Sequence, residues 1–162
     1  MMATRTVEWK GGEALKRKMA ELNKKLGTAG AVQVGFFEDE RYTPRHPIRG
    51  TKRKPLHVAQ VAFWNIYGTK RTPARDFMGA AIRGHQGNYG KDLADIGEAV
   101  GWDTRRALQL LGELMKEDVQ HSIQVWSQPA NAKRTQQIKG FNKPLIDDGT
   151  MQRAVGVKVV GV

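Results

Sequence analysis

The longest regular pattern in the chain is a row of apolar residues at helical spacing between Lys91 and Trp126. One continuous helix of this span would be about 52 Å long, whereas a globular chain of 162 residues has a radius of gyration of about 15 Å. The helix must therefore project beyond the globule or break, and Gly97 and Gly101 are candidate break points. Asp103 follows them and is typical of an N-cap, which predicts a central helix about 36 Å long.

Shorter patterns before and after this helix predict that the chain mixes helices with strands. The expected elements are an N-terminal helix at residues 12–26, a strand at 31–37, a helix at 56–67 ended by Gly68, a short helix capped by Asp76, and a final strand at 152–160. One or two further strands are expected within the loops. The predicted fold class is α+β, with a small mixed sheet packed by the N-terminal helix and the long central helix.

Length and composition predict one structural domain over residues 1–162, with a flexible N-terminus at residues 1–11. Two polar stretches, residues 38–55 and 127–143, are expected to form extended loops, and loops of that length are usually functional or disordered. No apolar run approaches the roughly 20 residues that span a bilayer, and the first residues lack the apolar region of a secretory signal. Together with the absence of cysteine, this pattern favours synthesis in a reducing cytoplasm.

The positive charge of the chain is concentrated in one stretch. The sequence has 27 lysines and arginines against 16 aspartates and glutamates, a net charge of +11. Between positions 41 and 75 there is no acidic residue, and the basic residues there are Arg41, Arg45, Arg49, Lys52, Arg53, Lys54, Lys70, Arg71 and Arg75. Such a local field is typical of contact with a polyanion, most often nucleic acid, and the alternative is a solvated loop without a ligand. Prolines and a glycine interrupt the stretch, so we expect no recognition helix there that could enter a groove of DNA. Contact with phosphates alone would not depend on base sequence.

The residue types of common catalytic sites are present, but not at the spacing that catalysis needs. The four histidines fit no zinc-binding pattern, no glycine-rich phosphate loop occurs, and neither Ser122 nor Ser127 lies in a nucleophile-elbow pattern. Asp147 and Asp148 are compatible with a bound cation, but Gly149 follows them, and Asp-Gly is typical of a turn. We therefore expect no enzymatic activity, no metal and no cofactor.

Three neighbouring aromatic residues, Phe63, Trp64 and Tyr67, allow two interpretations. Flat rings close to basic residues can stack on nucleic-acid bases. At helical spacing, however, aromatic residues more often belong to a core or to a subunit contact, and we favour this second interpretation.

Two segments of the chain carry a family resemblance. The first is residues 64–78, WNIYGTKRTPARDFM, and the second is residues 137–151, QIKGFNKPLIDDGTM. Together with the strand at residues 32–37 and the loop after it, they resemble the small neck and tail-completion proteins of tailed bacteriophages, also described as minor tail or virion-morphogenesis proteins. The order and spacing agree over about residues 30–160, although Asp76 replaces the family's proline and Asp148 its threonine.

The resemblance implies a structural virion protein that assembles as a homo-oligomeric ring, commonly of six copies, at the head–tail junction. Its expected partners are neighbouring neck or connector proteins, tail-terminator or tail-tube proteins, and the genomic DNA that passes through the channel, contacted without sequence preference. The expected location is the virion, after synthesis in the host cytoplasm. Nonspecific nucleic-acid binding is the alternative function.

The residues of the two segments suit the task of holding two loops in place. Gly68 would end a helix, Pro73 would stiffen the next loop, and Phe77 would enter the core behind an exposed Arg75. The turn into the final strand would be formed by Pro144, Leu145, Asp147 and Gly149. We expect the nine basic residues to face the DNA channel or a neighbouring subunit.

Overall fold

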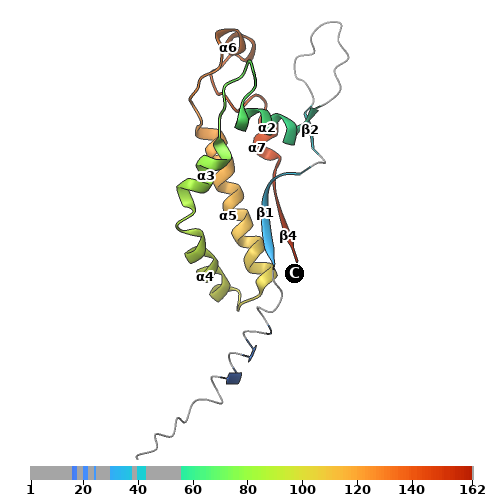
Figure 1. The fold of residues 1–162 in the computed structure, drawn as a ribbon, viewed down its shortest axis with the longest axis vertical. Helices are drawn as coiled ribbons and strands as arrows, with labels where there is room; N and C mark the ends of the chain where they lie inside the picture. The colour runs from blue at the N-terminus through green and yellow to red at the C-terminus, as the bar shows by residue number, and fades with distance from the viewer. Residues whose placement is uncertain are drawn as a thin grey trace, which may run out of the picture.

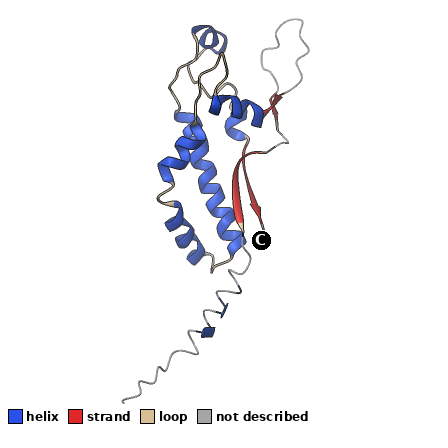
Figure 2. Cartoon of the chain, viewed as in Figure 1, coloured by secondary structure: helices blue, strands red, loops and turns tan. Residues whose placement is uncertain are grey.

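The computed structural model describes residues 16–17, 20–21, 24, 30–37, 40–42 and 56–161. Helices predominate among these residues and the strands are short (Figure 2), which confirms the predicted α+β class with one long central helix. Most of the expected helix at residues 12–26 lies outside the described residues, and the five described residues within it are helical. The expected flexible N-terminus at residues 1–11 and most of the expected loop at residues 38–55 also lie outside them.

Three short strands precede the helices α2 to α7 along the described chain, and one strand follows them (Figure 1). The helices are α2 (Val58–Tyr67), α3 (Phe77–His85), α4 (Tyr89–Ala99), α5 (Thr104–Val125), α6 (Lys133–Lys139) and α7 (Thr150–Arg153). The strands are β1 (Ala31–Phe36), β2 (Arg41–Tyr42), β3 (Leu56–His57) and β4 (Val155–Val160). Helix α5 is the centre of this arrangement, because α3, α4, β1 and β4 all pack against it.

Two aspartates fix where helices begin. The break expected before the central helix is confirmed, since Gly101 has a φ of 64° and the Asp103 carboxylate accepts a hydrogen bond of 3.0 Å from the Arg106 amide. The Asp76 carboxylate caps α3 in the same way, accepting a hydrogen bond of 2.8 Å from the Gly79 amide. Each cap satisfies an amide that has no partner within its own helix.

Strands β1 and β4 form an antiparallel pair that lies along α5 (Figure 1). Val34 is opposite Val157 in this register. The sheet approaches the helix closely at Gly112, where a methyl group would overlap the side chains of Val32 and Val157. Glycine is therefore the residue that lets β1 and β4 pack against the middle of α5.

The expected mixed sheet is wrong for the described residues. Their strands form two separate antiparallel pairs, β1 with β4 and β2 with β3. The short strand β2 is one of the extra strands that were expected within the loops, whereas β3 occupies the first two residues of the helix expected at residues 56–67. Strands β1 and β4 lie along the same helix, α5, and run in opposite directions.

The main core lies where α2, α3, α5 and β4 meet. Its largest side chains with almost no exposed surface are those of Phe77, Ile123, Met151, Val58 and Val155. The Phe77 ring packs edge-on against Phe36 of β1, with ring centroids 6.1 Å apart. Burial of these apolar groups is the main source of stability of this end of the molecule.

Two expected boundaries are corrected by short helices. The expected extended loop at residues 127–143 contains α6, which has a single apolar residue, Ile138, and therefore no apolar stripe in the sequence. Helix α6 ends at Gly140, whose φ of 80° gives a left-handed cap. The final strand begins at Val155 rather than at residue 152, because α7 occupies the residues after Gly149.

Candidate functional site

The two segments that carry the family resemblance lie together, since Phe77 of the first segment shares an apolar core with Leu145 and Met151 of the second. The loop between α2 and α3 contacts the chain that leads into α6 through Arg75, whose Nε donates to the Pro129 carbonyl at 3.0 Å and whose Nη2 donates to the Ala130 carbonyl at 3.2 Å. The backbone amide of Arg75 also donates to the Asn65 carbonyl of α2 at 2.6 Å. One residue thus connects α2, the loop before α3 and the segment before α6.

The expectation that Arg75 is exposed in a basic loop is wrong. Only 4% of its surface is accessible, and the removal of water around the guanidinium lowers the pKa of Arg75 from its ordinary value. Two backbone carbonyls hold the side chain inward. Arg75 therefore stabilises the loop and is not available to a ligand.

The motif residues before and after Arg75 occupy the places expected of them. Gly68 ends α2 with a φ of 76°, and a Cβ atom there would lie 2.9 Å from the Ala74 amide nitrogen. Thr69 Oγ1 accepts hydrogen bonds from the next loop amides, Pro73 is exposed on the turn, and Phe77 is fully buried. The sequence-based prediction for Gly68 and Phe77 is confirmed.

The segment at residues 144–149 is the expected turn. Pro144 and Leu145 are buried, and Gly149 has a φ of 80°, so the chain needs a glycine there. Partial burial would raise the pKa of Asp148, but hydrogen bonds from Thr150 and the charge of Arg153 outweigh it and hold that pKa below its ordinary value. No group of three or more possible metal ligands occurs among the described residues, and Asp147 and Asp148 form a turn.

One side of α2 is an exposed surface rich in aromatic side chains. Gln60, Phe63, Trp64 and Tyr67 follow one another at the spacing of a single helix face and are all exposed; we call these four residues the aromatic face. The exposed fractions of the three aromatic residues are 57% for Phe63, 37% for Trp64 and 69% for Tyr67. The rings of Phe63 and Tyr67 contact each other with centroids 4.6 Å apart.

The expectation of a mostly buried helix at residues 56–67 is corrected by this face. Only Val58 and Ala62 of α2 are buried. The helix contains no charged residue at all, although one of its sides meets solvent. An uncharged helix with three exposed aromatic side chains is suited to contact with another molecule.

The basic residues expected at the site differ in their surroundings. Arg41, Lys70 and Arg71 are exposed, and within the described residues Lys70 and Arg71 form no ion pair. Arg45, Arg49, Lys52, Arg53 and Lys54 lie outside the described residues. Lys70 and Arg71 follow α2 directly, so their charges lie beside one end of the aromatic face.

The region around α6 adds positive charge that was not expected at the site from the sequence. Residues 127–143 contain Lys133, Arg134, Lys139 and Lys143 and no acidic residue. Burial lowers the pKa of Lys139, and the nearby Arg75 acts in the same direction against the opposing effect of Asp147. The sequence shows residues 127–143 as a second stretch without acidic residues. Only the fold brings this stretch close to the loop at residues 69–75.

A polar cluster joins α3, α4 and α5 on another part of the surface. The Asp118 carboxylate lies 2.6 Å from His85 Nδ1 and accepts a hydrogen bond of 2.9 Å from the Tyr89 hydroxyl. Burial and the Asp118 carboxylate raise the pKa of Tyr89. The Ser122 hydroxyl, also on α5, donates to the Phe77 carbonyl at 2.8 Å. No sequence pattern connects these residues, which meet only through helix packing.

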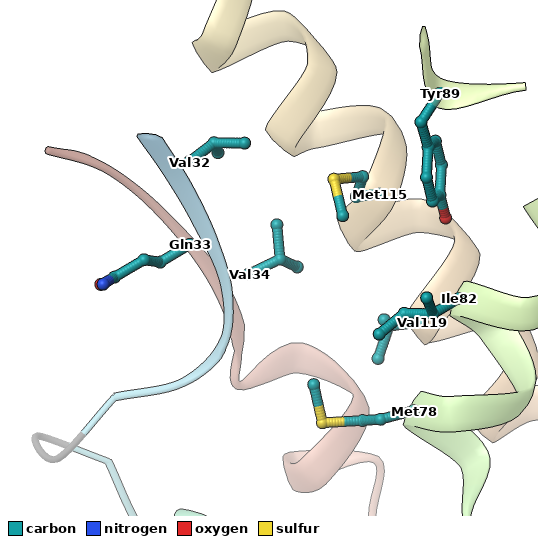
Figure 3. A pocket seen from close by; sticks show the side chains of 8 residues that line it. All are labelled: Val32, Gln33, Val34, Met78, Ile82, Tyr89, Met115 and Val119. Atoms are coloured by element: carbon teal, nitrogen blue, oxygen red, sulfur yellow. The ribbon is translucent and has the colours of Figure 1, made fainter. Parts of the chain in front are cut away.

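An apolar groove lies between β1, α3 and α5 (Figure 3). Its volume is about 340 Å³. It is lined by Val32, Gln33, Val34, Met78, Ile82, Tyr89, Met115 and Val119. Figure 3 shows the valine side chains of β1 on one side and the side chains of the helices on the other. No sequence pattern indicates this groove, because its walls come from four separate elements.

Comparison with known proteins finds no protein-family model, curated protein or solved structure that matches the chain. Among the described residues, none of the helices combines the length and the apolar character required to cross a membrane.

Proposed function

We propose that this chain is a structural virion protein of a tailed bacteriophage that forms a ring at the head–tail junction, around the DNA channel, and joins the connector to the tail. The resemblance of residues 64–78 and 137–151 to neck and tail-completion proteins supports this proposal. The observation that carries it is the aromatic face of α2, with its three exposed aromatic side chains and no charge. Centres of protein–protein interfaces are enriched in aromatic residues and depleted of charged ones.

The basic residues support the same function. A ring around DNA presents positive charge to the channel or to an acidic neighbouring ring, and Arg41, Lys70 and Arg71 are exposed for such contacts. Contact with phosphates alone is independent of base sequence and weakens with salt, which suits a channel through which DNA must slide. We propose a hexamer that contacts neck or connector proteins on one side and tail-terminator or tail-tube proteins on the other.

The test is the mass of the purified protein together with its role in particle assembly. Native mass spectrometry of the protein, alone and with isolated connectors or tails, should detect a closed ring, with six copies expected. Phage particles lacking the protein should accumulate heads and tails that are not joined, and the wild-type gene supplied in trans should restore infectivity. A protein that stays monomeric in every mixture, or fully infectious particles without it, would contradict the proposal.

Nonspecific nucleic-acid binding is a second candidate, favoured by one observation. Lys70 and Arg71 are exposed and form no ion pair within the described residues, and they follow a helix with exposed aromatic rings on which bases can stack. This function predicts a monomer that binds duplex or single-stranded DNA with micromolar affinity and a steep salt dependence. A ring with only weak DNA binding supports the first function instead. We retain the expectation that the chain has no enzymatic activity.

A further inference from the structure

We propose that the aromatic face of one copy docks into the apolar groove between β1, α3 and α5 of the next copy. This inference rests on the proposed ring and specifies which surfaces build it. The two surfaces lie on different elements, so the contact between neighbouring copies is heterologous. A heterologous contact generates a closed ring when the rotation between copies closes.

The aromatic face has the properties of the inserted surface. Phe63 and Tyr67 already contact each other with centroids 4.6 Å apart, so little side-chain freedom is lost when they are covered. Trp64 and Tyr67 belong to the residue types that dominate binding energy in interfaces. No charge on α2 would have to be removed from water.

The groove has the properties of the receiving surface. Its volume of about 340 Å³ lies at the small end of the roughly 300–1,000 Å³ typical of ligand pockets, which suits side chains rather than a large cofactor. Met78 and Met115 are flexible apolar side chains that adapt to an inserted ring. Ile82 is 41% exposed at the groove and remains in contact with water until a partner covers it.

Charge complementarity identifies a second copy as the occupant. Helices α3, α4 and α5, which form the helical walls of the groove, carry eight acidic residues against five basic ones when the N-caps Asp76 and Asp103 are included. Lys70 and Arg71, which directly follow the aromatic face, would bring positive charge to these acidic helices. DNA would be repelled by the same helices, so a nucleic acid is a poor occupant of the groove.

Cysteine cross-linking tests the contact, since the natural chain contains no cysteine. Gln60→Cys marks the aromatic face and Ile82→Cys marks the groove, because Ile82 lines the groove, and both positions are exposed. With a short bis-maleimide, the double variant should give a ladder that ends at the ring size. A mixture of the two single variants should give dimers and nothing larger, and each single variant alone should stay uncross-linked. The matched control, Gln60→Cys with Gln109→Cys, places the second cysteine at an exposed site of α5 outside the groove and should remain monomeric on a denaturing gel.

Two further variants test the same contact without cross-linker. Ile82→Trp should fill the groove, and Phe63→Glu should place a charge on the aromatic face; each should raise the protein concentration needed for ring formation by about tenfold or more. Leu110→Trp and Leu110→Glu are the matched controls, because Leu110 is 44% exposed on α5 and does not line the groove. These controls should assemble like the wild type.

The outcomes separate this inference from the proposed function. A ring that forms normally but gives no ladder from the double variant, and tolerates both Ile82→Trp and Phe63→Glu, overturns the inference and leaves the ring in place. Absence of any ring, in the wild type and with connectors, overturns both. Loss of DNA binding in Phe63→Glu with unchanged ring formation would assign the aromatic face to nucleic acid and would also overturn the inference.

Discussion

At the scale of single residues, Arg75 shows how a charge can be structural rather than functional. Its guanidinium is buried and bound to the carbonyls of Pro129 and Ala130, whereas Arg71, four residues earlier, is exposed. We expect Arg75→Ala to lower the free energy of unfolding by about 2–3 kcal/mol, because two carbonyls would be deprived of a charged donor. Arg71→Ala should change it by no more than about 0.5 kcal/mol. Urea unfolding of both variants measures the difference, and equal effects would contradict the structural role.

Gly149 is the residue whose backbone conformation the final turn requires. Its φ of 80° is costly for any residue with a side chain, and more so for a β-branched one. Gly149→Val should lower the free energy of unfolding by about 2 kcal/mol. Gly87→Val provides the control, because Gly87 lies in a turn, has no such φ and has no atom within 4 Å of an added Cβ. Thermal unfolding that shifts equally for both variants would remove the turn argument.

The residue scale also shows what could be predicted for the site from sequence. Gly68, Phe77 and Gly149 were identified because backbone freedom and core packing are local properties of residue type. The burial of Arg75 could not be predicted, because its partners lie 54 and 55 residues further along the chain. The three aromatic residues of the aromatic face were recognised as a set, but their exposure depends on which side of α2 the core covers.

At the scale of elements, the helices with strong caps were predictable and those without an apolar stripe were not. Asp76 and Asp103 mark the beginnings of α3 and α5 in the sequence as clearly as in the structure. Helix α6 depends on its surroundings instead: Gln136 Nε2 donates to the Asn131 carbonyl and Lys139 Nζ to the Lys143 carbonyl, both at 2.6 Å. Such side-chain contacts with neighbouring loops leave no periodic signal in the sequence.

The packing of α5 on the β1–β4 pair gives a prediction for elements. Gly112→Ala should lower the free energy of unfolding by about 1–2 kcal/mol, because the added methyl overlaps Val32 and Val157 and outweighs the gain in helix propensity. Gly84→Ala in α3 has no neighbour within 4 Å and should instead raise it by about 0.5–1 kcal/mol. Opposite signs in chemical denaturation support the close packing; a stabilising Gly112→Ala would contradict it.

The position of β2 against the turn at residues 147–149 gives a prediction in alkaline solution. Burial, and then the charges of Asp148 and Asp147, raise the pKa of Tyr42 from 10.0 to about 12. The folded state therefore binds the proton of the Tyr42 hydroxyl more tightly than the unfolded state does. Protonated Tyr42 contributes its full share to the free energy of unfolding below pH 10.0, and this share is lost as the pH rises towards about 12. Tyr42→Phe should therefore reduce the alkaline loss of stability, as followed by urea unfolding across that range. An unchanged pH dependence would show that β2 does not pack against the turn.

At the scale of the whole molecule, charge and apolar surface are distributed unevenly. The helices α4 and α5 carry an excess of acidic residues, whereas the loop at residues 69–75 and residues 127–143 carry basic residues without a single acidic one. The exposed aromatic face and the apolar groove are a second pair of complementary surfaces, because one is a helix face with protruding rings and the other is a groove. A molecule with complementary surfaces on different elements is suited to head-to-tail association with copies of itself.

The basic residues at positions 49–54 provide the prediction at this scale. Reversing the charges of Arg49, Lys52, Arg53 and Lys54 should leave thermal unfolding unchanged and impair ring assembly or particle infectivity. The free wild-type protein should bind duplex DNA only weakly. Reversing these charges should reduce the slope of the logarithm of the binding constant against the logarithm of the salt concentration, by about one for each phosphate that the variant no longer neutralises. Lys158→Glu, at an exposed position of β4, is the control for a single reversed charge and should leave infectivity intact.

Two measurements decide this prediction, because a channel lining must let DNA slide while a DNA-binding protein must hold it. A filter-binding or fluorescence titration across a range of salt concentrations gives the affinity and its slope. Nanomolar binding at physiological salt would contradict a passive channel, since tightly held phosphates would resist DNA passage. Loss of monomer stability on charge reversal would contradict the prediction differently: it would show that residues 49–54 belong to the folded core, as Arg75 does, rather than to a surface between subunits.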